Sequence, residues 1–150
     1  RRLQQQAASP AEALPKTAPL GQGSGLPEPL RSYVGGDFDT LKWRPLGRGA
    51  YQIPIRTGDR ETKVRLLRIP AGKPVPEHSH GGLELTLVLA GAFTDETGAF
   101  HAGDVEVADE TLDHTPRATD DGPCLCVAAT DAPLHFRAML PRLLQPLFRI

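Results

Sequence analysis

Short apolar segments, separated by glycine- and proline-containing turns, follow one another along the chain from residue 33 onwards. Residues 63–69 end at Pro70, and the apolar run 83–90 ends at Gly91. Short strands at such regular spacing are typical of antiparallel sandwiches and barrels, and no long helical period interrupts them. We therefore predict an all-β fold, a small antiparallel barrel in which 83–90 is a strongly buried strand. The expected strands are 43–47, 51–55, 63–69, 83–90, 92–94, 99–101, 105–107 and 124–129, and prolines limit the first two to sheet edges.

A group of ionisable residues stands out against this apolar background. His78 and His80 lie two positions apart, so on an extended segment their side chains point to the same face. Glu84 begins the apolar run, where a carboxylate is costly to bury unless a metal or a hydrogen-bonding partner compensates it. In a small barrel alternate residues face inward, so these three side chains and His114 can converge from neighbouring strands. We predict His78, His80, Glu84 and His114 as metal ligands; the alternative is that the histidines are exposed loop residues.

Several metals suit three neutral imidazoles and one carboxylate, among them zinc, iron, manganese, nickel and copper. Four protein ligands in a closed tetrahedron are typical of structural or regulatory zinc, whereas octahedral iron or manganese keeps open positions for oxygen or substrate. We expect Zn²⁺, with Fe, Mn or Ni as alternatives. No residue is predicted to be catalytic, because the other candidate barrel-lining residues are mostly Leu, Val and Thr.

Length and charge restrict the class of protein. With 150 residues the chain can form one domain with a substantial core. Its formal net charge of -1 argues against direct binding of nucleic acid. No segment approaches the roughly 18 consecutive apolar residues of a transmembrane helix, so we expect no membrane partner.

The two ends of the chain differ from this central part. Residues 1–26 are rich in Gln, Ala, Pro, Gly and Ser and begin without methionine, so we interpret them as a flexible linker from a missing N-terminal domain, or else as a naturally flexible terminus. Residues 27–150 then form the metal-binding domain. Near the C-terminus, apolar residues recur at helical spacing, but Pro146 would break a continuous helix. We expect a short helical or irregular tail that packs on the domain or on a partner.

The two cysteines, Cys124 and Cys126, are two positions apart and share one face of a strand. A disulfide between such neighbours would be strained, which favours a reduced, cytoplasmic location. The thiols are candidates for redox sensing or auxiliary ligation, although buried cysteines usually behave as small apolar residues. His101 and His135 lack companions at ligand spacing, and Glu77 could orient His78 or simply be solvated.

The spacing of the candidate ligands resembles a known superfamily. Gly72-x5-His78-x-His80-x3-Glu84-x6-Gly91 resembles the first motif of the cupins at every defined position. Gly103-x10-His114 is similar to the second motif in spacing, and His114 stands where that family has its fourth ligand. Asp109, Thr111 and Ala118 depart from the usual Pro, Gly and Asn of this second motif. The resemblance implies a cupin (jelly-roll) barrel with these four ligands.

Other segments narrow the resemblance. Residues 43–47, 67–72, 78–84 and 88–98 look like the cupin-like domain of ChrR-type zinc-dependent anti-sigma factors, and the similarity covers roughly 39–136. In that family a helical N-terminal domain holds an extracytoplasmic-function sigma factor away from RNA polymerase. The cupin domain is implied to sense oxidative signals such as singlet oxygen. The resemblance therefore implies a bacterial sensor domain of an anti-sigma factor, which is not an enzyme and which reaches the sigma factor through the missing N-terminal domain.

Two other functions stay open at this point. A small cupin dioxygenase or isomerase would need an open coordination position and an acid or base beside it. A binding module without chemistry would take up a small ligand inside the barrel. The fold does not decide among the three, because cupins include all of them.

Overall fold

A computed structural model of the chain describes residues 25–47 and 49–137. Apart from one short helix, the regular elements of the described residues are strands that are all paired antiparallel, which confirms the all-β prediction. In this part of the chain no helix is long and apolar enough to cross a membrane. The elements are α1 (Glu28–Val34), β1 (Arg44–Gly47), β2 (Ala50–Ile55), β3 (Lys63–Ile69), β4 (His78–His80), β5 (Glu84–Ala90), β6 (Ala92–Thr94), β7 (Ala99–His101), β8 (Val105–Ala108), β9 (Arg117–Ala118), β10 (Cys124–Thr130) and β11 (Leu134–Phe136).

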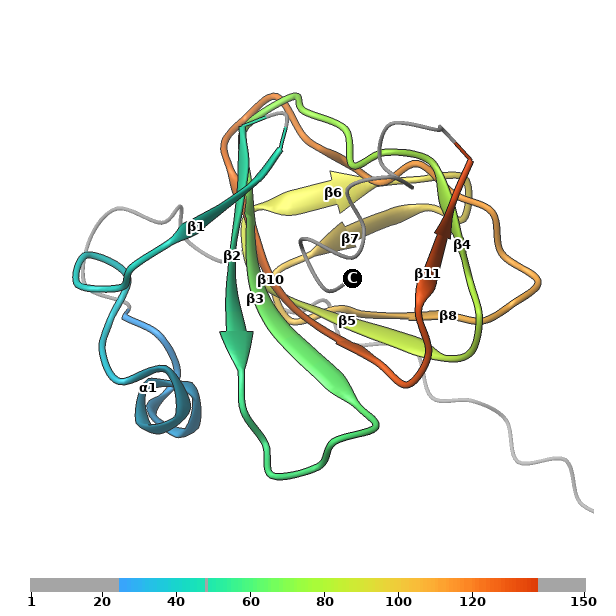
Figure 1. The fold of residues 1–150 in the computed structure, drawn as a ribbon. Coiled ribbons are helices and arrows are strands. Elements are labelled where there is room, and N and C mark those ends of the chain that lie inside the picture. Colours follow the sequence, from blue (N-terminus) through green and yellow to red (C-terminus); the bar gives the residue numbers. More distant parts are fainter. Residues whose placement is uncertain (1–24, 48, 138–150) are drawn as a thin grey trace, which may run out of the picture.

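Three sheets enclose the interior of a barrel. The main sheet has six strands in the order β1-β2-β3-β10-β5-β8, and the smaller sheets are β7-β6-β9 and β11-β4. Figure 1 shows how the main sheet curves, so that β6, β7, β4 and β11 lie across from β2 and β3. The pair β4–β11 therefore closes one side of the barrel, and it carries the two histidines of the His-x-His motif.

The backbone at Gly91 explains why β5 ends there, and a turn after β6 reverses the chain direction. Gly91 has a φ of 71°, and a Cβ atom at this position would lie 2.3 Å from the carbonyl oxygen of Pro123. Only glycine fits such a close approach in the left-handed region. A hairpin turn at Asp95–Gly98 joins β6 to β7, and in it the Asp95 amide donates to the Gly98 carbonyl at 3.0 Å.

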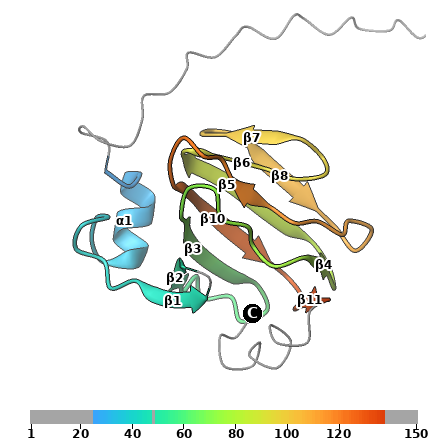
Figure 2. The ribbon, with the colours of Figure 1, turned by 90° about the horizontal axis from the view of Figure 1, so that it is seen from above.

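The outer face of the main sheet carries an apolar layer beneath α1. Figure 2 shows the helix beside β2 and β3, on the side of the sheet away from β4 and β11. Leu66 is fully buried in this layer, and Leu30 and Val34 of α1 pack against it. The buried members of the layer are Leu26, Ile55, Leu66, Ala90 and Leu125.

A second cluster lies on the inner face. Val88 and Cys124, 1% exposed each, pack there against Phe93, which stacks on Phe100 with ring centroids 4.9 Å apart. This cluster fills one end of the barrel with apolar side chains. The other end, where β5 begins, contains the buried polar residues Glu84 and Thr86.

Helix α1 was not predicted. It has only seven residues, Pro27 stands at its N-cap, and Gly35 ends it in the left-handed conformation at a φ of 77°. Leu30 and Val34, four positions apart on one helical face, are the signal that could have identified it. The helix forms because that face covers the main sheet.

The predicted strand 83–90 is present as β5, but its description as strongly buried was wrong for one face. Its side chains alternate, so Glu84 and Thr86 are buried while Leu85 and Leu87 are 42% and 36% exposed. On the neighbouring strand β8, Val105 and Val107 pair with these two leucines and are exposed as well. An apolar run identifies a strand without showing which of its faces is covered.

The edge position predicted for the first two strands holds for β1 but was wrong for β2. β2 lies between β1 and β3, although it contains Pro54. Proline is tolerated there because β1 pairs only with Ala50, Tyr51 and Gln52, so β1 does not reach Pro54.

The predictions for the two ends of the chain fall largely outside the described residues. Leu26, the last residue of the predicted linker, is 2% exposed in the apolar layer, and its amide donates to Asp37 at 2.8 Å. The predicted C-terminal tail, with Leu140, Leu143, Leu144, Leu147 and Phe148, lies outside the described residues.

Candidate metal centre

The four predicted ligands come from three segments that meet inside the barrel. His78 and His80 point inward from β4, and Glu84 is the first residue of β5. His114 lies in the connection between β8 and β9, where it forms a two-way backbone bridge with His78. The amide of each residue donates to the carbonyl of the other, at 3.1 and 3.0 Å. This bridge holds the connection beside β4.

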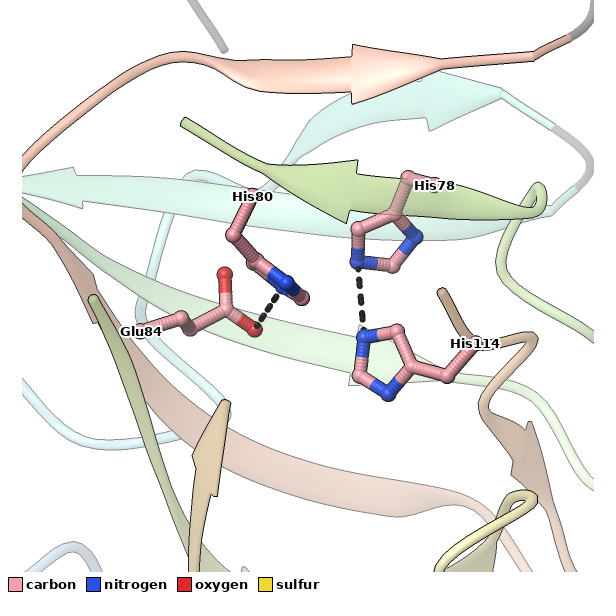
Figure 3. A group of neighbouring side chains, drawn as sticks. All are labelled: His78, His80, Glu84 and His114. Carbon is pink, nitrogen blue, oxygen red and sulfur yellow. Dashed lines mark hydrogen bonds and ion pairs between the residues drawn. The ribbon is translucent and has the colours of Figure 1, made fainter. Parts of the chain in front are cut away.

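The structure brings all four side chains together, as Figure 3 shows. One possible ligand atom from each lies within 4.8 Å of those of the others. The ring centroids of the three histidines are 4.6 to 5.1 Å apart. Each residue is buried, with exposed fractions of 3%, 3%, 8% and 1% in chain order. A divalent cation between them would be coordinated from several sides.

Hydrogen bonds outside the cluster orient two of the imidazoles. His78 donates from Nδ1 to the carbonyl oxygen of Pro76 at 2.8 Å, and His114 donates from Nδ1 to Oδ2 of Asp95 at 2.7 Å. With Nδ1 protonated, a neutral imidazole has its lone pair on Nε2. The two Nε2 atoms face each other 3.1 Å apart. Two lone pairs in this arrangement need a cation between them, either a proton or a metal ion.

His80 gives the second indication that a metal fits. Among the described residues, neither of its ring nitrogens has a hydrogen-bonding partner, although both are buried. The nearest carboxylate oxygen, Oε1 of Glu84, lies 3.8 Å from Nε2 and accepts a hydrogen bond from Thr86 at 3.2 Å. Buried polar atoms without partners are costly, and a bound metal would satisfy them. The donor set therefore fits a divalent metal such as zinc.

The ionisation states of the candidate ligands also suit a bound metal ion. Burial lowers the pKa of His78 to about 4, so its ring is neutral at physiological pH. Burial raises the pKa of Glu84, but the neighbouring histidines lower it by more, and this carboxylate stays ionised. Neutral imidazole and ionised carboxylate are the forms that bind metals.

Two acidic residues beside His114 were not predicted. Asp95 lies 2.7 Å from Nδ1 of His114, and Oε1 of Glu106 lies 3.3 Å from the same nitrogen. Burial lowers the pKa of His114, but these two carboxyl groups outweigh that effect and raise it. The alternation Val105-Glu106-Val107 is the signal that could have identified Glu106, since it places a carboxyl group on the inner face of a strand.

The other candidates from the sequence do not belong to the four-residue cluster. Cys124 and Cys126 are buried free thiols, and neither belongs to a metal-type cluster among the described residues. His101 and His135 are exposed. Glu77 does not orient an imidazole; it forms an ion pair with Arg137 at 3.3 Å.

Comparison with known proteins agrees with this fold. Residues 32–132 match the model of a family described as the ChrR cupin-like domain. The Anti-sigma-E factor ChrR of Cereibacter sphaeroides is 56% identical over 124 residues, which are 83% of this chain and 58% of that protein. The chain thus spans a little more than half the length of this curated relative.

Solved structures show the same fold. The crystal structure of Rhodobacter sphaeroides SigE in complex with the anti-sigma ChrR matches with a TM-score of 0.66 and 54% identity, over 70% of this chain and 57% of that chain. An RmlC-like cupin protein from Ralstonia eutropha JMP134 matches with a TM-score of 0.54 and 22% identity, over 69% and 71% of the two chains. The second likeness shows the fold alone, and the predicted cupin barrel is confirmed.

The resemblance inferred from the motifs is confirmed as well. The matched region contains strands β1 to β10, the hairpin at Asp95–Gly98 and all four candidate ligands. This chain therefore belongs to the family of ChrR cupin-like domains.

Proposed function

We propose that this domain is the metal-binding sensor of an anti-sigma factor and that it binds one zinc ion through His78, His80, Glu84 and His114. The observation that carries the proposal is the set of four buried ligand side chains in a chain 56% identical to an anti-sigma factor. Iron, manganese and nickel are the alternatives to zinc. Four protein ligands suit a regulatory zinc site.

The position of the ligands suggests how a signal reaches the rest of the domain. Strand β4, strand β5 and the connection that carries His114 each contribute to the centre, so a bound zinc ion would tie three segments together. Zinc would supply a strong attraction between these segments without redox chemistry of its own. Loss or oxidation of one ligand would release a segment and shift the domain to another conformation.

The partner of the whole protein is an extracytoplasmic-function sigma factor in this proposal. The relative Anti-sigma-E factor ChrR extends beyond the part that matches this chain. We infer that an N-terminal domain outside this chain contacts the sigma factor in the bacterial cytoplasm. The cupin domain would control release of the sigma factor in response to oxidative stress, such as singlet oxygen.

We assign no catalytic role to the domain. The two acidic side chains nearest the centre, Asp95 and Glu106, both lie against Nδ1 of His114. A carboxylate that is held in this way supports a ligand and is not free to act as a general base on a substrate.

The proposal is tested on a protein in which this domain is joined to a sigma-binding domain. Its complex with the sigma factor is exposed to singlet oxygen, and the released sigma factor is measured by size-exclusion chromatography. Glu84→Ala is expected to make release of the sigma factor independent of the oxidant, because loss of the ionised ligand already frees β5 from the centre. His101→Ala is the matched control, since His101 is exposed and lies outside the centre. Normal release from the Glu84→Ala protein would refute the proposal.

A further inference from the structure

Asp95 uses its two carboxylate oxygens for different parts of the molecule. Oδ1 accepts hydrogen bonds from the Thr97 amide at 2.8 Å, the Thr97 hydroxyl at 2.7 Å and the Gly98 amide at 3.2 Å. Oδ2 accepts the Nδ1 proton of His114 at 2.7 Å. One side chain thus connects the turn between β6 and β7 with a candidate metal ligand.

The contact between Asp95 and His114 is enclosed. The side chains of both residues are 0% exposed, and that of Glu106, which lies against the same imidazole nitrogen, is 4% exposed. A buried carboxylate fixes the geometry of its partner more strongly than an exposed one, because water does not compete for the hydrogen bond. Carboxylates placed in this way hold the ring of a metal-binding histidine in one tautomer.

A second contact fastens the same turn to the segment that follows His114. Oε2 of Glu96 accepts the amide proton of Thr115 at 2.9 Å. Glu96, Thr97 and Gly98 themselves are exposed. The turn is therefore held to the connection that carries His114 at two points, while its outer surface faces solvent.

We propose that Asp95 is a positioning residue of the metal centre, which presents Nε2 of His114 to the metal and couples metal binding to the order of the exposed turn Asp95–Gly98. The proposal rests on the proposed zinc site. Glu106 lies against Nδ1 of His114 from the inner face of β8 and limits rotation of the ring. When the metal is lost, the His114 side chain is held only through Nδ1, so its bond to Asp95 breaks more readily and the turn loosens.

The first test compares Asp95→Asn with Asp104→Asn in the full 150-residue chain. Asp104 is a matched control, because its carboxylate accepts the His101 amide at 2.8 Å in the next turn and touches no candidate ligand. Zinc affinity is measured by competition with a chromophoric chelator, and the ligand geometry by the absorption spectrum of the cobalt-substituted protein. Circular dichroism shows whether each variant is folded.

Asp95→Asn is expected to raise the zinc dissociation constant by about 10–100-fold and to change the cobalt spectrum, with one metal ion still bound per chain. Asp104→Asn should match the wild type in both measurements. A wild-type affinity and cobalt spectrum in Asp95→Asn would overturn the proposal. Two metal ions per wild-type chain would also overturn it, because Asp95, Glu106 and His114 would then themselves be a metal site.

The second test needs no variant. Amide hydrogen exchange is followed in the wild-type chain by NMR, before and after a chelator removes zinc. Exchange at Thr97 and Gly98 is expected to accelerate at least about tenfold, because local opening becomes easier, while exchange at Asp104 stays unchanged. Equal rates with and without zinc would overturn the coupling. A wild-type chain that binds no zinc at all would refute the zinc site itself, whereas equal zinc binding by the wild type and Asp95→Asn refutes only the role of Asp95.

Discussion

The apolar layer beneath α1 and the metal centre lie on opposite faces of the same six-stranded sheet, and both are buried. The layer consists of aliphatic side chains such as Leu66, and its stability depends on tight packing. The metal centre consists of ionisable side chains, and two ring nitrogens of His80 are left without partners among the described residues. Packing alone therefore stabilises one face, whereas the other depends on a bound ion.

We infer from this difference that the apolar clusters determine folding, whereas the metal centre determines sensing. The aliphatic layer and the cluster around Val88 can hold the barrel together without a metal. The metal centre joins two segments to β5 of the main sheet: β4, which pairs with β11, and the connection that carries His114, which is bridged to His78. A signal that displaces the metal can thus rearrange these segments and leave the barrel folded.

The largest effect is expected in the layer beneath α1. Leu66→Ala should lower the free energy of unfolding by about 2–5 kcal/mol, because it removes a fully buried side chain and leaves a cavity. Zinc affinity should stay within about threefold of the wild type, since distant sites behave independently. Urea denaturation and a zinc titration measure the two quantities. A large loss of zinc affinity in this variant would show that the two faces are coupled.

His80→Ala is the reciprocal change. Removing one of four ligands should weaken zinc binding on the order of 100-fold, or about 2.7 kcal/mol. The stability of the metal-free protein should change little, because the substitution also removes two buried nitrogens that lack partners. Isothermal titration calorimetry and thermal unfolding with a chelator test this pair of outcomes. A metal-free variant as destabilised as Leu66→Ala would mean that His80 is a packing residue.

Acid should affect the layer beneath α1 before it unfolds the barrel. Asp37 accepts the amide protons of Leu26 and Phe38, and the first of these bonds is the main reason that the pKa of this carboxyl lies below its usual value. A lowered folded-state pKa means that the contribution of Asp37 is fully present above about pH 3.9 and is lost as the pH falls further. Asp37→Asn should remove this acid-dependent loss of stability. Fluorescence of Trp43, which packs against the layer, reports it.

The smallest effect is expected on the uncovered part of the outer face. Leu85→Thr should change the free energy of unfolding by no more than about 0.5 kcal/mol, because Leu85 is 42% exposed and threonine suits a strand. Leu66 on β3, which faces the same side of the sheet but lies under α1, is the contrasting position. If Leu85→Thr and Leu66→Ala were equally destabilised, the covered and uncovered parts of this face would not differ as described.

Patterns with a fixed period could be predicted from the sequence. His78 and His80 share a face because strand side chains alternate, and Gly91 marks the end of β5 because no other residue fits there. The convergence of Asp95 and Glu106 on His114 could not be predicted, since Asp95 lies 19 positions before His114 in the sequence. Such contacts depend on how the hairpin and β8 are placed in three dimensions.

The exposure of Leu85 and the presence of α1 were missed for a related reason. Both depend on which part of the sheet the N-terminal segment covers. Leu26, Leu30 and Val34 supply the apolar contacts that place the helix over β2 and β3 (Figure 2). The outer side chains of β8 and of the first half of β5 therefore stay exposed. An apolar run in the sequence does not contain that information.

The most direct test of the central claim is zinc-edge X-ray absorption of the chain reconstituted with one equivalent of zinc. The account predicts three imidazole nitrogens and one carboxylate at about 2.0–2.2 Å, with no sulfur in the coordination shell. A zinc–sulfur distance near 2.3 Å, the value of a cysteine ligand, would place the metal at Cys124 or Cys126 instead. That result, or the absence of bound zinc, would contradict the metal centre of His78, His80, Glu84 and His114.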